Sequence, residues 1–313
     1  MDPVIAHLLE AAHGATSATA LVAAGVARRD VERAVGRGLL IRLRRNALVD
    51  GELWRTSAPW QRHSLRARAV AAGLTTDEGC PVILTHHSAL AVQGVSLHGV
   101  DDRVHLAWAD GRRGRTSALV RVHRAVPTGF TTDVLGHACV TIAAGCVQVA
   151  AAFGAEAGLV SADDALHRRV MSRRQLEEAL ARLGVARASR APGYMVALAD
   201  ARIESAAESR ARWAFRVAGI QQPTPQVELR DEWGEVWARL DFLIEEFGVV
   251  IEIDGMGKYA DVRDLRAEKL REDRLRELGY EVVWLTWADL GNPGVVRRKV
   301  DAAMVRARRR RTA

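Results

Sequence analysis

The chain has 313 residues, of which 49% are hydrophobic and 27% charged, a composition typical of folded globular domains and not of fibrous or disordered chains. Its formal net charge of +7 favours anionic partners such as nucleic acids. The sequence has no apolar run long enough to cross a membrane, no basic-then-apolar leader and no CxxC pair among its three cysteines. We therefore expect a cytoplasmic protein without a membrane partner or a disulfide framework.

Residues 15–50 predict a DNA-binding unit. Helical apolar spacing in SATALVAAG stops at Gly25, and the same spacing in ARRDVERAVGRG stops at Gly36 and Gly38, which is the order of a helix-turn-helix. The segment LLIRLRRNALV that follows alternates in the way a strand with one wet, basic face would. A winged helix-turn-helix over residues 1–55 accounts for both features.

Arginines of this unit are the candidate DNA contacts. We expect the second helix to enter a major groove and the hairpin to meet phosphates, because the bidentate geometry of arginine suits both tasks. The candidates are Arg28, Arg29 and Arg33 on the helix, with Arg37 as a further position, and Arg42, Arg44 and Arg45 on the wing. The alternative is a helical docking domain whose arginines are merely exposed.

Residues 56–195 predict a mixed α/β domain. Its strands are VHLAWAD and SALVRVHRA, and its helices include an alanine-rich stretch at 143–165 and RRQLEEAL, which Ser172 is placed to cap. Five histidines of this segment raise the question of a metal site: His86, His87, His98, His105 and His123. They lack HxxxH or HExxH spacing, so the sequence alone does not support a metal site among them.

The last domain, residues 196–313, predicts an α-β-β-β-α-β order that ends in a basic tail around 306–311. Its first helix, DARIESAAESRARWAFRVAG, spans about five turns and places Glu204, Glu208 and Arg212 on one face. A hairpin turned at residues 231–234 then delivers Asp241 on its second strand. The fold class expected for the whole chain is thus multidomain, mixed α/β.

Acids on two neighbouring strands form the candidate catalytic site. In VVIEIDG, Glu252 and Asp254 point to the same face of a strand. Strand-borne acids among β-branched neighbours are costly to bury unless a cation neutralises them. With Asp241 they make three hard oxygen ligands, which suit Mg²⁺ or Mn²⁺. Ordinary ion pairs with Arg212, Arg239 and Lys269 are the structural alternative.

Residues 200–291 resemble the PD-(D/E)XK, or restriction-endonuclease-like, nucleases, in particular the very-short-patch-repair branch. The motifs that carry this resemblance are AESRAR, LDF, VVIEIDGMGKY and EKLREDRLRELGYEVVWLTWADL. The resemblance implies metal-assisted hydrolysis of a phosphodiester bond.

The resemblance also implies roles for single residues. Glu208 matches the acid of the first helix, and Asp241 and Glu252 match the metal-holding acids. Asp254 stands where the family usually has lysine, so Lys258 becomes the candidate cation that stabilises developing charge. On the helix that follows, Lys269 and Arg271 are candidate nucleic-acid contacts, although such a helix is also typical of a solvated face.

Residues 1–195 resemble, more loosely, type IV toxin-antitoxin antitoxins of the AbiEi kind. The resemblance rests on IRLRRNALV, THHSALAVQGV and VHLAW, and it implies a bacterial protein with a toxin partner. Two hypotheses remain open: a Mg²⁺-dependent DNA endonuclease guided by the winged helix, acting in defence or repair, and a DNA-binding antitoxin or repressor with an inactive nuclease fold. Proteins of both kinds often act as dimers, so a homodimer is a further expectation.

Overall fold

The chain folds into two compact units, and each is described by itself. The first comprises residues 1–165 with 170–197, and the second comprises 166–169 with 198–313. The computed structural model describes residues 2–114, 116–184, 189–254 and 262–312. Its mixture of helices with several sheets confirms the predicted multidomain α/β class. Within these described ranges, no helix combines the length and the apolar character that crossing a membrane requires.

Residues 2–50 form three helices and a three-stranded sheet. The order is α1 (Pro3–Ala11), β1 (Ala15–Thr16), α2 (Ala18–Ala23), α3 (Arg28–Gly36), β2 (Leu40–Arg44) and β3 (Ala47–Asp50), with β3 between β1 and β2. Leu21, Val31, Leu40 and Leu48 are buried together in the core of this part. The two predicted helices and the hairpin are confirmed as elements, and the structure adds α1 and β1, which complete the arrangement of a winged helix.

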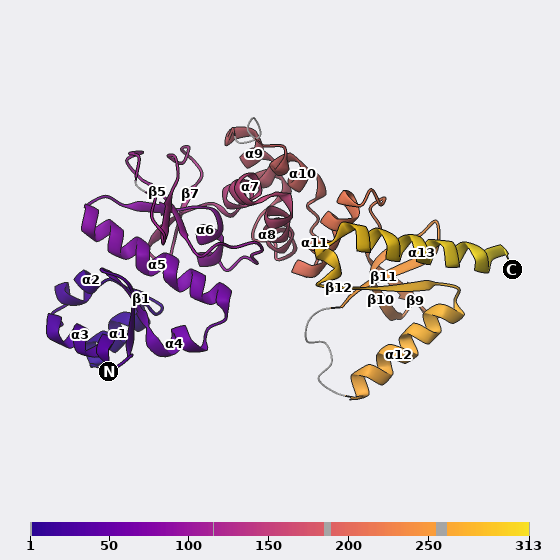
Figure 1. Ribbon diagram of the computed structural model, residues 1–313, viewed down its shortest axis with the longest axis horizontal. Coiled ribbons are helices and arrows are strands. Elements are labelled where there is room, and N and C mark those ends of the chain that lie inside the picture. The colour runs from indigo at the N-terminus through magenta and orange to yellow at the C-terminus, as the bar shows by residue number, and fades with distance from the viewer. Residues whose placement is uncertain (1, 115, 185–188, 255–261, 313) are drawn as a thin grey trace. The chain divides into compact units, whose positions relative to one another are not determined.

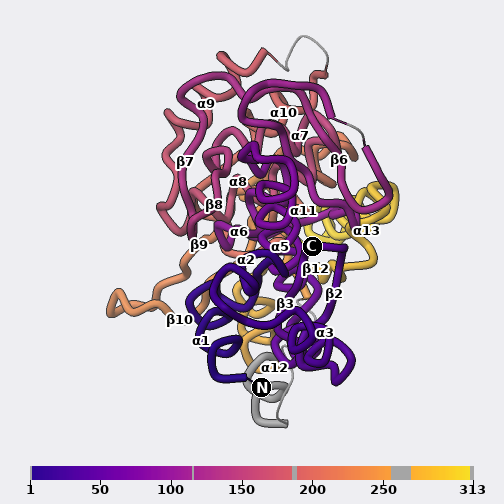
Figure 2. Tube along the Cα trace, turned by 90° about the vertical axis from the view of Figure 1, so that its left-hand side faces the viewer, coloured from indigo at the N-terminus to yellow at the C-terminus, as the bar shows by residue number. Residues whose placement is uncertain are grey.

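Helix α5 (Pro59–Glu78) joins the winged helix to the rest of the first unit (Figure 1). It follows the short helix α4 (Gly51–Thr56) and contacts β1 and β3 as well as α6 and β4. The predicted boundary at residue 55 therefore does not separate two compact units, because one long helix packs into both parts. In both views, the indigo winged-helix elements lie at one end of this unit and α7, α9 and α10 at the other (Figures 1 and 2).

A buried asparagine fixes α5 against the wing. Asn46, in the turn between β2 and β3, donates from Nδ2 to the carbonyl oxygen of Gly73 at 3.4 Å and to Oδ1 of Asp77 at 2.8 Å. Its own Oδ1 accepts from the backbone N–H of Thr19 at 3.0 Å. Gly73 permits this approach, since a Cβ atom there would lie 2.1 Å from the carbonyl oxygen of Asn46.

The middle of the first unit is a mixed five-stranded sheet with the order β6-β5-β4-β8-β7. Its strands are β4 (Val82–Leu84), β5 (Val104–Trp108), β6 (Val120–Val122), β7 (Thr131–Val134) and β8 (His137–Val140), and helix α6 (His86–Val92) follows β4. Strands β5 and β6 confirm the two strands predicted in this segment. They run parallel, with His105 opposite Arg121.

Helices α7 (Ile142–Phe153), α8 (Ala155–His167), α9 (Arg173–Arg182) and α10 (Ala191–Leu198) follow the sheet. Helix α7 contacts both α6 and α9. Ser172 caps α9 as predicted: its Oγ accepts from the backbone N–H of Gln175 at 3.2 Å, and Oε1 of Gln175 accepts from the backbone N–H of Ser172 at 2.8 Å. This reciprocal cap satisfies two backbone donors that a helix start leaves unpaired.

The second unit has the predicted α-β-β-β-α-β order. Its elements are α11 (Ala206–Val217), β9 (Thr224–Arg230), β10 (Val236–Ile244), β11 (Val249–Asp254), α12 (Val262–Glu277), β12 (Glu281–Thr286), the 3-10 helix η2 (Asp289–Gly291) and α13 (Pro293–Thr312). In the sheet order β12-β11-β10-β9, the pairs β9–β10 and β10–β11 are antiparallel and β11–β12 is parallel. The predicted turn at residues 231–234 connects β9 to β10.

Helices cover both faces of this sheet (Figure 1). One face packs against α11 and α13 around Phe215, Phe242 and Ile251. The other face packs against α12 around Val250 and Leu275. Side chains of β11 alternate between the two clusters, because successive residues of a strand point to opposite faces. The face that holds Val250 is therefore also the face of Glu252.

The predicted basic C-terminal tail is the end of a helix, α13, which extends to Thr312. Two of its arginines contact one acid of β12: Arg306 pairs with Glu281, and Nη2 of Arg310 lies 3.2 Å from Oε2 of Glu281. Buried alanines such as Ala303 and Ala307 hold the same helix on the sheet.

Gly73→Ala is expected to lower the free energy of unfolding by about 1–3 kcal/mol, because the new methyl group has to push α5 away from the wing. Gly36→Ala in α3 is the matched control, since a Cβ atom there meets nothing within 4 Å. The control should be neutral or slightly stabilising. Urea denaturation measures both, and equal stability of Gly73→Ala and the wild type would contradict the proposed contact.

Candidate functional site

The predicted acids lie on neighbouring strands of the second unit. Phe242 pairs with Ile251 at the end of the antiparallel β10–β11 ladder, and Asp241 and Glu252 are the next residues of the two strands. Asp254 shares a face with Glu252 by alternation along β11. Glu252 and Asp254 therefore lie on the sheet face that α12 covers.

The backbone of β11 orients the carboxylate of Asp241. Its Oδ2 accepts a hydrogen bond from the backbone N–H of Ile253 at 2.8 Å. Both Asp241 and Asp254 are half-buried. A carboxylate held by a backbone amide is fixed in direction, which is the condition for a ligand or catalytic group to act at a defined position.

Glu252 is the most deeply buried of the three acids. Its side chain is 4% exposed, and its Oε1 lies 3.1 Å from Nη1 of Arg271. Leu275 lies one helical turn further along α12 and packs in the core, so the helical period also directs Arg271 toward the sheet. A buried carboxylate without a partner costs several kcal/mol. Arg271, which was predicted as a DNA contact, offsets this cost. It therefore belongs to the acid site, by which we mean Asp241, Glu252 and Asp254.

Glu208 is buried where α11 begins and takes part in its N-terminal cap. Its Oε1 accepts from Oγ of Ser205 at 2.7 Å, while its Oε2 accepts from the backbone N–H of Glu204 at 3.2 Å and from Nε2 of Gln226 at 2.7 Å. Because Ser205 caps the helix, α11 begins at Ala206. The prediction of a helix from residue 200 with Glu204 on its acidic face was therefore wrong.

The remaining candidates of this unit differ in what the structure describes. Lys258, the candidate cation, lies outside the described residues. Lys269 is exposed on α12, in contrast to Arg271, which contacts the buried Glu252. Arg239 pairs with Glu204. The set of Asp241, Glu252 and Asp254 as ligands of Mg²⁺ or Mn²⁺ stays a prediction. The common face of Glu252 and Asp254 and the contact of Asp241 with the backbone of β11 support it.

The arginines of α3 form the exposed basic surface predicted for DNA. The exposed arginines are Arg28, Arg29, Arg33 and Arg37. Val31 and Ala34 of the same helix are buried in the winged-helix core, so the helical period turns the arginines outward. Nη1 of Arg33 lies 2.6 Å from Oδ1 of Asp30, an exposed pair that contributes little to stability.

The arginines of the wing are partly engaged within the protein. Nη2 of Arg42 lies 2.6 Å from Oε1 of Glu32, and Nη1 of Arg44 lies 3.8 Å from Oδ2 of Asp77. Arg45 is exposed in the turn after β2. The β2–β3 register shifts between Arg42 and Arg44, so the strict alternation predicted for this strand was wrong. The irregularity lets Arg44 reach the acid on α5.

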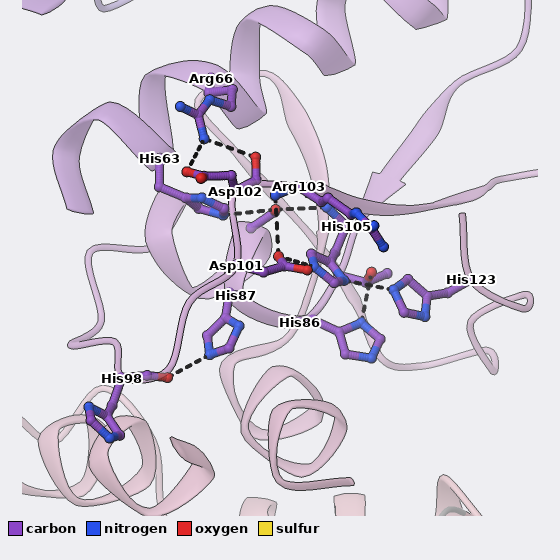
Figure 3. A network of polar contacts seen from close by, with 12 residues as sticks. His63, Arg66, His86, His87, His98, Asp101, Asp102, Arg103, His105 and His123 are labelled. Atoms are coloured by element: carbon purple, nitrogen blue, oxygen red, sulfur yellow. Dashed lines mark hydrogen bonds and ion pairs between the residues drawn. The ribbon is translucent and has the colours of Figure 1, made fainter. Parts of the chain in front are cut away.

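The structure also assembles a histidine cluster that local sequence spacing did not indicate (Figure 3). His86 at the start of α6, His105 in β5 and His123 after β6 each offer a ligand atom within 4.8 Å of the others, a grouping found among the described residues. The sequence argument against a metal here is thereby weakened, because ligands from three separate elements need no HxxxH spacing. The one available signal was a histidine on each of two predicted strands.

Polar contacts order this cluster. Nε2 of His105 lies 2.8 Å from Oδ1 of Asp101, and its Nδ1 lies 2.8 Å from Nε2 of His123. Nδ1 of His86 lies 3.0 Å from Oγ1 of Thr85. The rings of His86 and His123 stack with 3.8 Å between their centroids. One nitrogen of His105 thus contacts a carboxylate, and the other faces a second imidazole.

Burial keeps the histidines of this network neutral. It lowers the pKa of His123 to about 4 and is also the main cause of the lowered pKa of His86 and of His105. His63 of α5 belongs to the same region, with Nε2 3.1 Å from Oγ of Ser88, and burial lowers its pKa to about 3. Neutral imidazole is the form that binds metal ions.

Comparison with known proteins finds relatives of this chain, and their names state no activity. No model of a known protein family matches the chain. The chain is similar to two proteins of Mycobacterium tuberculosis, the uncharacterized protein MT2308 of strain CDC 1551 / Oshkosh and the uncharacterized protein Rv2248 of strain ATCC 25618 / H37Rv. Each is 28% identical over 227 residues, which cover 71% of this chain and 83% of the relative. The similarity thus extends over most of the chain.

The free energy of unfolding is expected to fall as the pH drops below 6.5. A buried histidine then binds a proton in the unfolded state but stays neutral in the folded state. For His63 the range runs from 6.5 down to about 3, with a slope of up to about 1.4 kcal/mol per pH unit. His63→Gln should flatten this dependence, and His7→Gln, at an exposed position of α1, should not. Urea denaturation with a chelator present at pH 7.5 and 5 measures it. An unchanged slope in His63→Gln would count against the assignment.

Proposed function

We propose that this protein is a Mg²⁺- or Mn²⁺-dependent DNA endonuclease that uses its winged helix to hold DNA. The observation that carries the proposal is the buried Glu252 carboxylate on β11, with Asp241 of the adjacent strand β10 hydrogen-bonded to the backbone of Ile253, the residue next to Glu252. The resemblance of this segment to restriction-endonuclease-like nucleases supports the same function. A cytoplasmic location follows from it, because the substrate is DNA.

A purely structural role explains the acid site less well. Replacing a buried ion pair such as Glu252–Arg271 with apolar residues of similar size is often neutral or stabilising. The pair is therefore not needed to hold α12 on the sheet, where apolar contacts around Leu275 already act. Acids that remain buried at such a position favour a function that needs their charge.

The residues of the site divide into ligand-holding and charge-balancing groups. Asp241, fixed by the Ile253 amide, and Glu252 are the groups that would hold the ion, with Asp254 at the end of the same strand. When bound, a divalent ion supplies positive charge to the phosphate undergoing hydrolysis. Arg271 stands next to Glu252 and adds a second positive charge there. It can take the charge-stabilising role for which Lys258 was the sequence candidate.

The second candidate function is a DNA-binding antitoxin or repressor with an inactive nuclease fold and a toxin partner. One observation favours it: the guanidinium of Arg271 already neutralises Glu252, so these two groups are balanced without a metal ion. The lysine that the nuclease family usually has is replaced by Asp254. Both functions use the exposed arginines of α3, so DNA binding alone does not separate them.

Plasmid nicking separates the two functions. Wild-type protein with Mg²⁺ or Mn²⁺ is expected to nick supercoiled plasmid, and Asp241→Asn and Glu252→Gln should each lower the rate about a hundredfold or more, because each removes a charge that holds the ion. Asp241→Asn retains an oxygen that can accept from the Ile253 amide, so its fold should persist.

Glu228→Gln is the matched control, because this acid is exposed on β9 of the same sheet. It should nick at the wild-type rate. Circular dichroism of each variant checks that the fold is intact. Tight DNA binding by the wild type without nicking in either metal would favour the repressor and rule out the nuclease.

DNA binding is expected to depend on α3. The double variant Arg28→Ala/Arg29→Ala should weaken binding to DNA of any sequence and reduce the slope of log K against log salt by about one for each phosphate that the variant no longer neutralises. The matched control is Arg173→Ala/Arg174→Ala in α9, which changes net charge equally. Fluorescence anisotropy over a range of salt concentrations measures both. Equal losses of affinity in the two variants would show that net charge alone attracts DNA.

A further inference from the structure

The histidine cluster lies in the first unit and is used by neither the nuclease chemistry nor the DNA surface. His105 is fully buried, His86 is 7% exposed and His123 is half-buried. The ring of Phe153 borders the cluster, with its centroid 5.3 Å from that of His105. Three imidazoles drawn from separate elements thus meet, two of them buried and one half-buried (Figure 3).

Asp101 determines which nitrogen of His105 carries the proton. A carboxylate can only accept hydrogen bonds, so the 2.8 Å contact places the proton on Nε2 of His105. The lone pair of neutral His105 is then on Nδ1, which lies 2.8 Å from Nε2 of His123. That second contact is either a hydrogen bond donated by His123 or two lone pairs directed at one cation.

We propose that His86, His105 and His123 bind one divalent transition-metal ion, with Zn²⁺ as the ion of choice. Asp101 holds His105 in the tautomer that a metal ligand requires. A ligating histidine whose other ring N–H donates to a carboxylate is the usual arrangement at zinc sites. Three protein ligands leave a fourth position for water or another molecule. This inference does not rest on the nuclease proposal, since the two sites share no residue.

The geometry needs only side-chain adjustment to accept an ion. Tetrahedral zinc with bonds of about 2.0–2.1 Å keeps its ligand nitrogens about 3.3 Å apart. The pair of His105 and His123, now at 2.8 Å, has to open by roughly half an ångström. His86 has to turn about its Cβ–Cγ bond, out of its stack on His123, to direct a nitrogen at the ion.

The chemistry of the donors selects the class of metal. Imidazole nitrogen suits Zn²⁺, Cu²⁺, Ni²⁺ and iron, whereas Mg²⁺ prefers carboxylate and water oxygens. Mg²⁺ in excess should therefore not occupy the histidine cluster, although it is the ion proposed for the acids of the second unit. This difference allows the two sites to be measured separately on the full chain.

The test is calorimetric titration of Zn²⁺ into untagged, full-length protein that has been treated with chelator and transferred to buffer with millimolar Mg²⁺. The expected result is one Zn²⁺ per chain for the wild type. His123→Phe keeps a ring to stack on His86 but offers no nitrogen. Its affinity should fall by more than the roughly 10–100-fold that removal of an outer-sphere partner costs.

Two neighbouring aspartates, Asp101 and Asp102, give a matched pair of variants that tests whether Asp101 supports the ligand His105. Asp101→Ala should weaken Zn²⁺ binding by about 10–100-fold, because His105 loses the partner that fixes its tautomer. Asp102→Ala should leave binding unchanged, since the Asp102 side chain is fully exposed and pairs with Arg66. Circular dichroism of both variants confirms that the comparison is between folded proteins.

Asp241→Asn is expected to bind Zn²⁺ as the wild type does, whether or not the protein nicks DNA. The proposal is overturned if wild-type protein takes up none of Zn²⁺, Co²⁺ or Ni²⁺, which would leave the cluster as a neutral hydrogen-bonded network. It is equally overturned if His123→Phe binds Zn²⁺ as tightly as the wild type, or if Asp241→Asn abolishes binding and so places the ion in the second unit.

Discussion

The contact between the buried Glu252 carboxylate and Arg271 is the constraint on which the candidate nuclease site depends. Strand β11 is covered on both faces, so the charge of Glu252 has little access to water. The apolar contacts of Leu275 hold α12 against the sheet, and Arg271, one turn away, is then placed to meet the acid. Because leaving one buried charge without its partner is strongly unfavourable, the guanidinium of Arg271 is what allows Glu252 to be buried as a charged group.

The first unit also buries several polar groups as neutral side chains. Asn46 satisfies its amide through contacts with α2 and α5, and the close approach of backbone at Gly73 makes this possible. His63 and His105 are buried in their neutral form, for which desolvation costs far less than for a charged group. Hydrogen bonds to Ser88 and Asp101 then satisfy the Nε2 atoms of His63 and His105.

Much of the fold could be predicted from the sequence, because apolar spacing reports which side of an element faces a core. The helices of the winged helix, the cap at Ser172 and the common face of Glu252 and Asp254 follow from such local rules. The contact of Arg271 with Glu252 and the meeting of His86 with His105 and His123 could not be predicted, since each joins segments far apart in the sequence. The helix start at Ser205 could have been predicted, because the spacing of Ser205 and Glu208 is that of a capping box. The four-residue spacing of Glu204 and Glu208 instead led to the prediction of a longer helix.

The two proposed metal sites of this chain differ in the charges that surround the ion. The imidazoles of the histidine cluster are neutral, so an ion there displaces no proton from them. At the acid site, an ion has to share Glu252 with the guanidinium of Arg271, and two cations beside one carboxylate repel each other. Under the proposed function, the phosphate of bound DNA supplies the negative charge that allows both to remain. Metal and DNA should then bind the second unit cooperatively, since each lowers the electrostatic cost of the other.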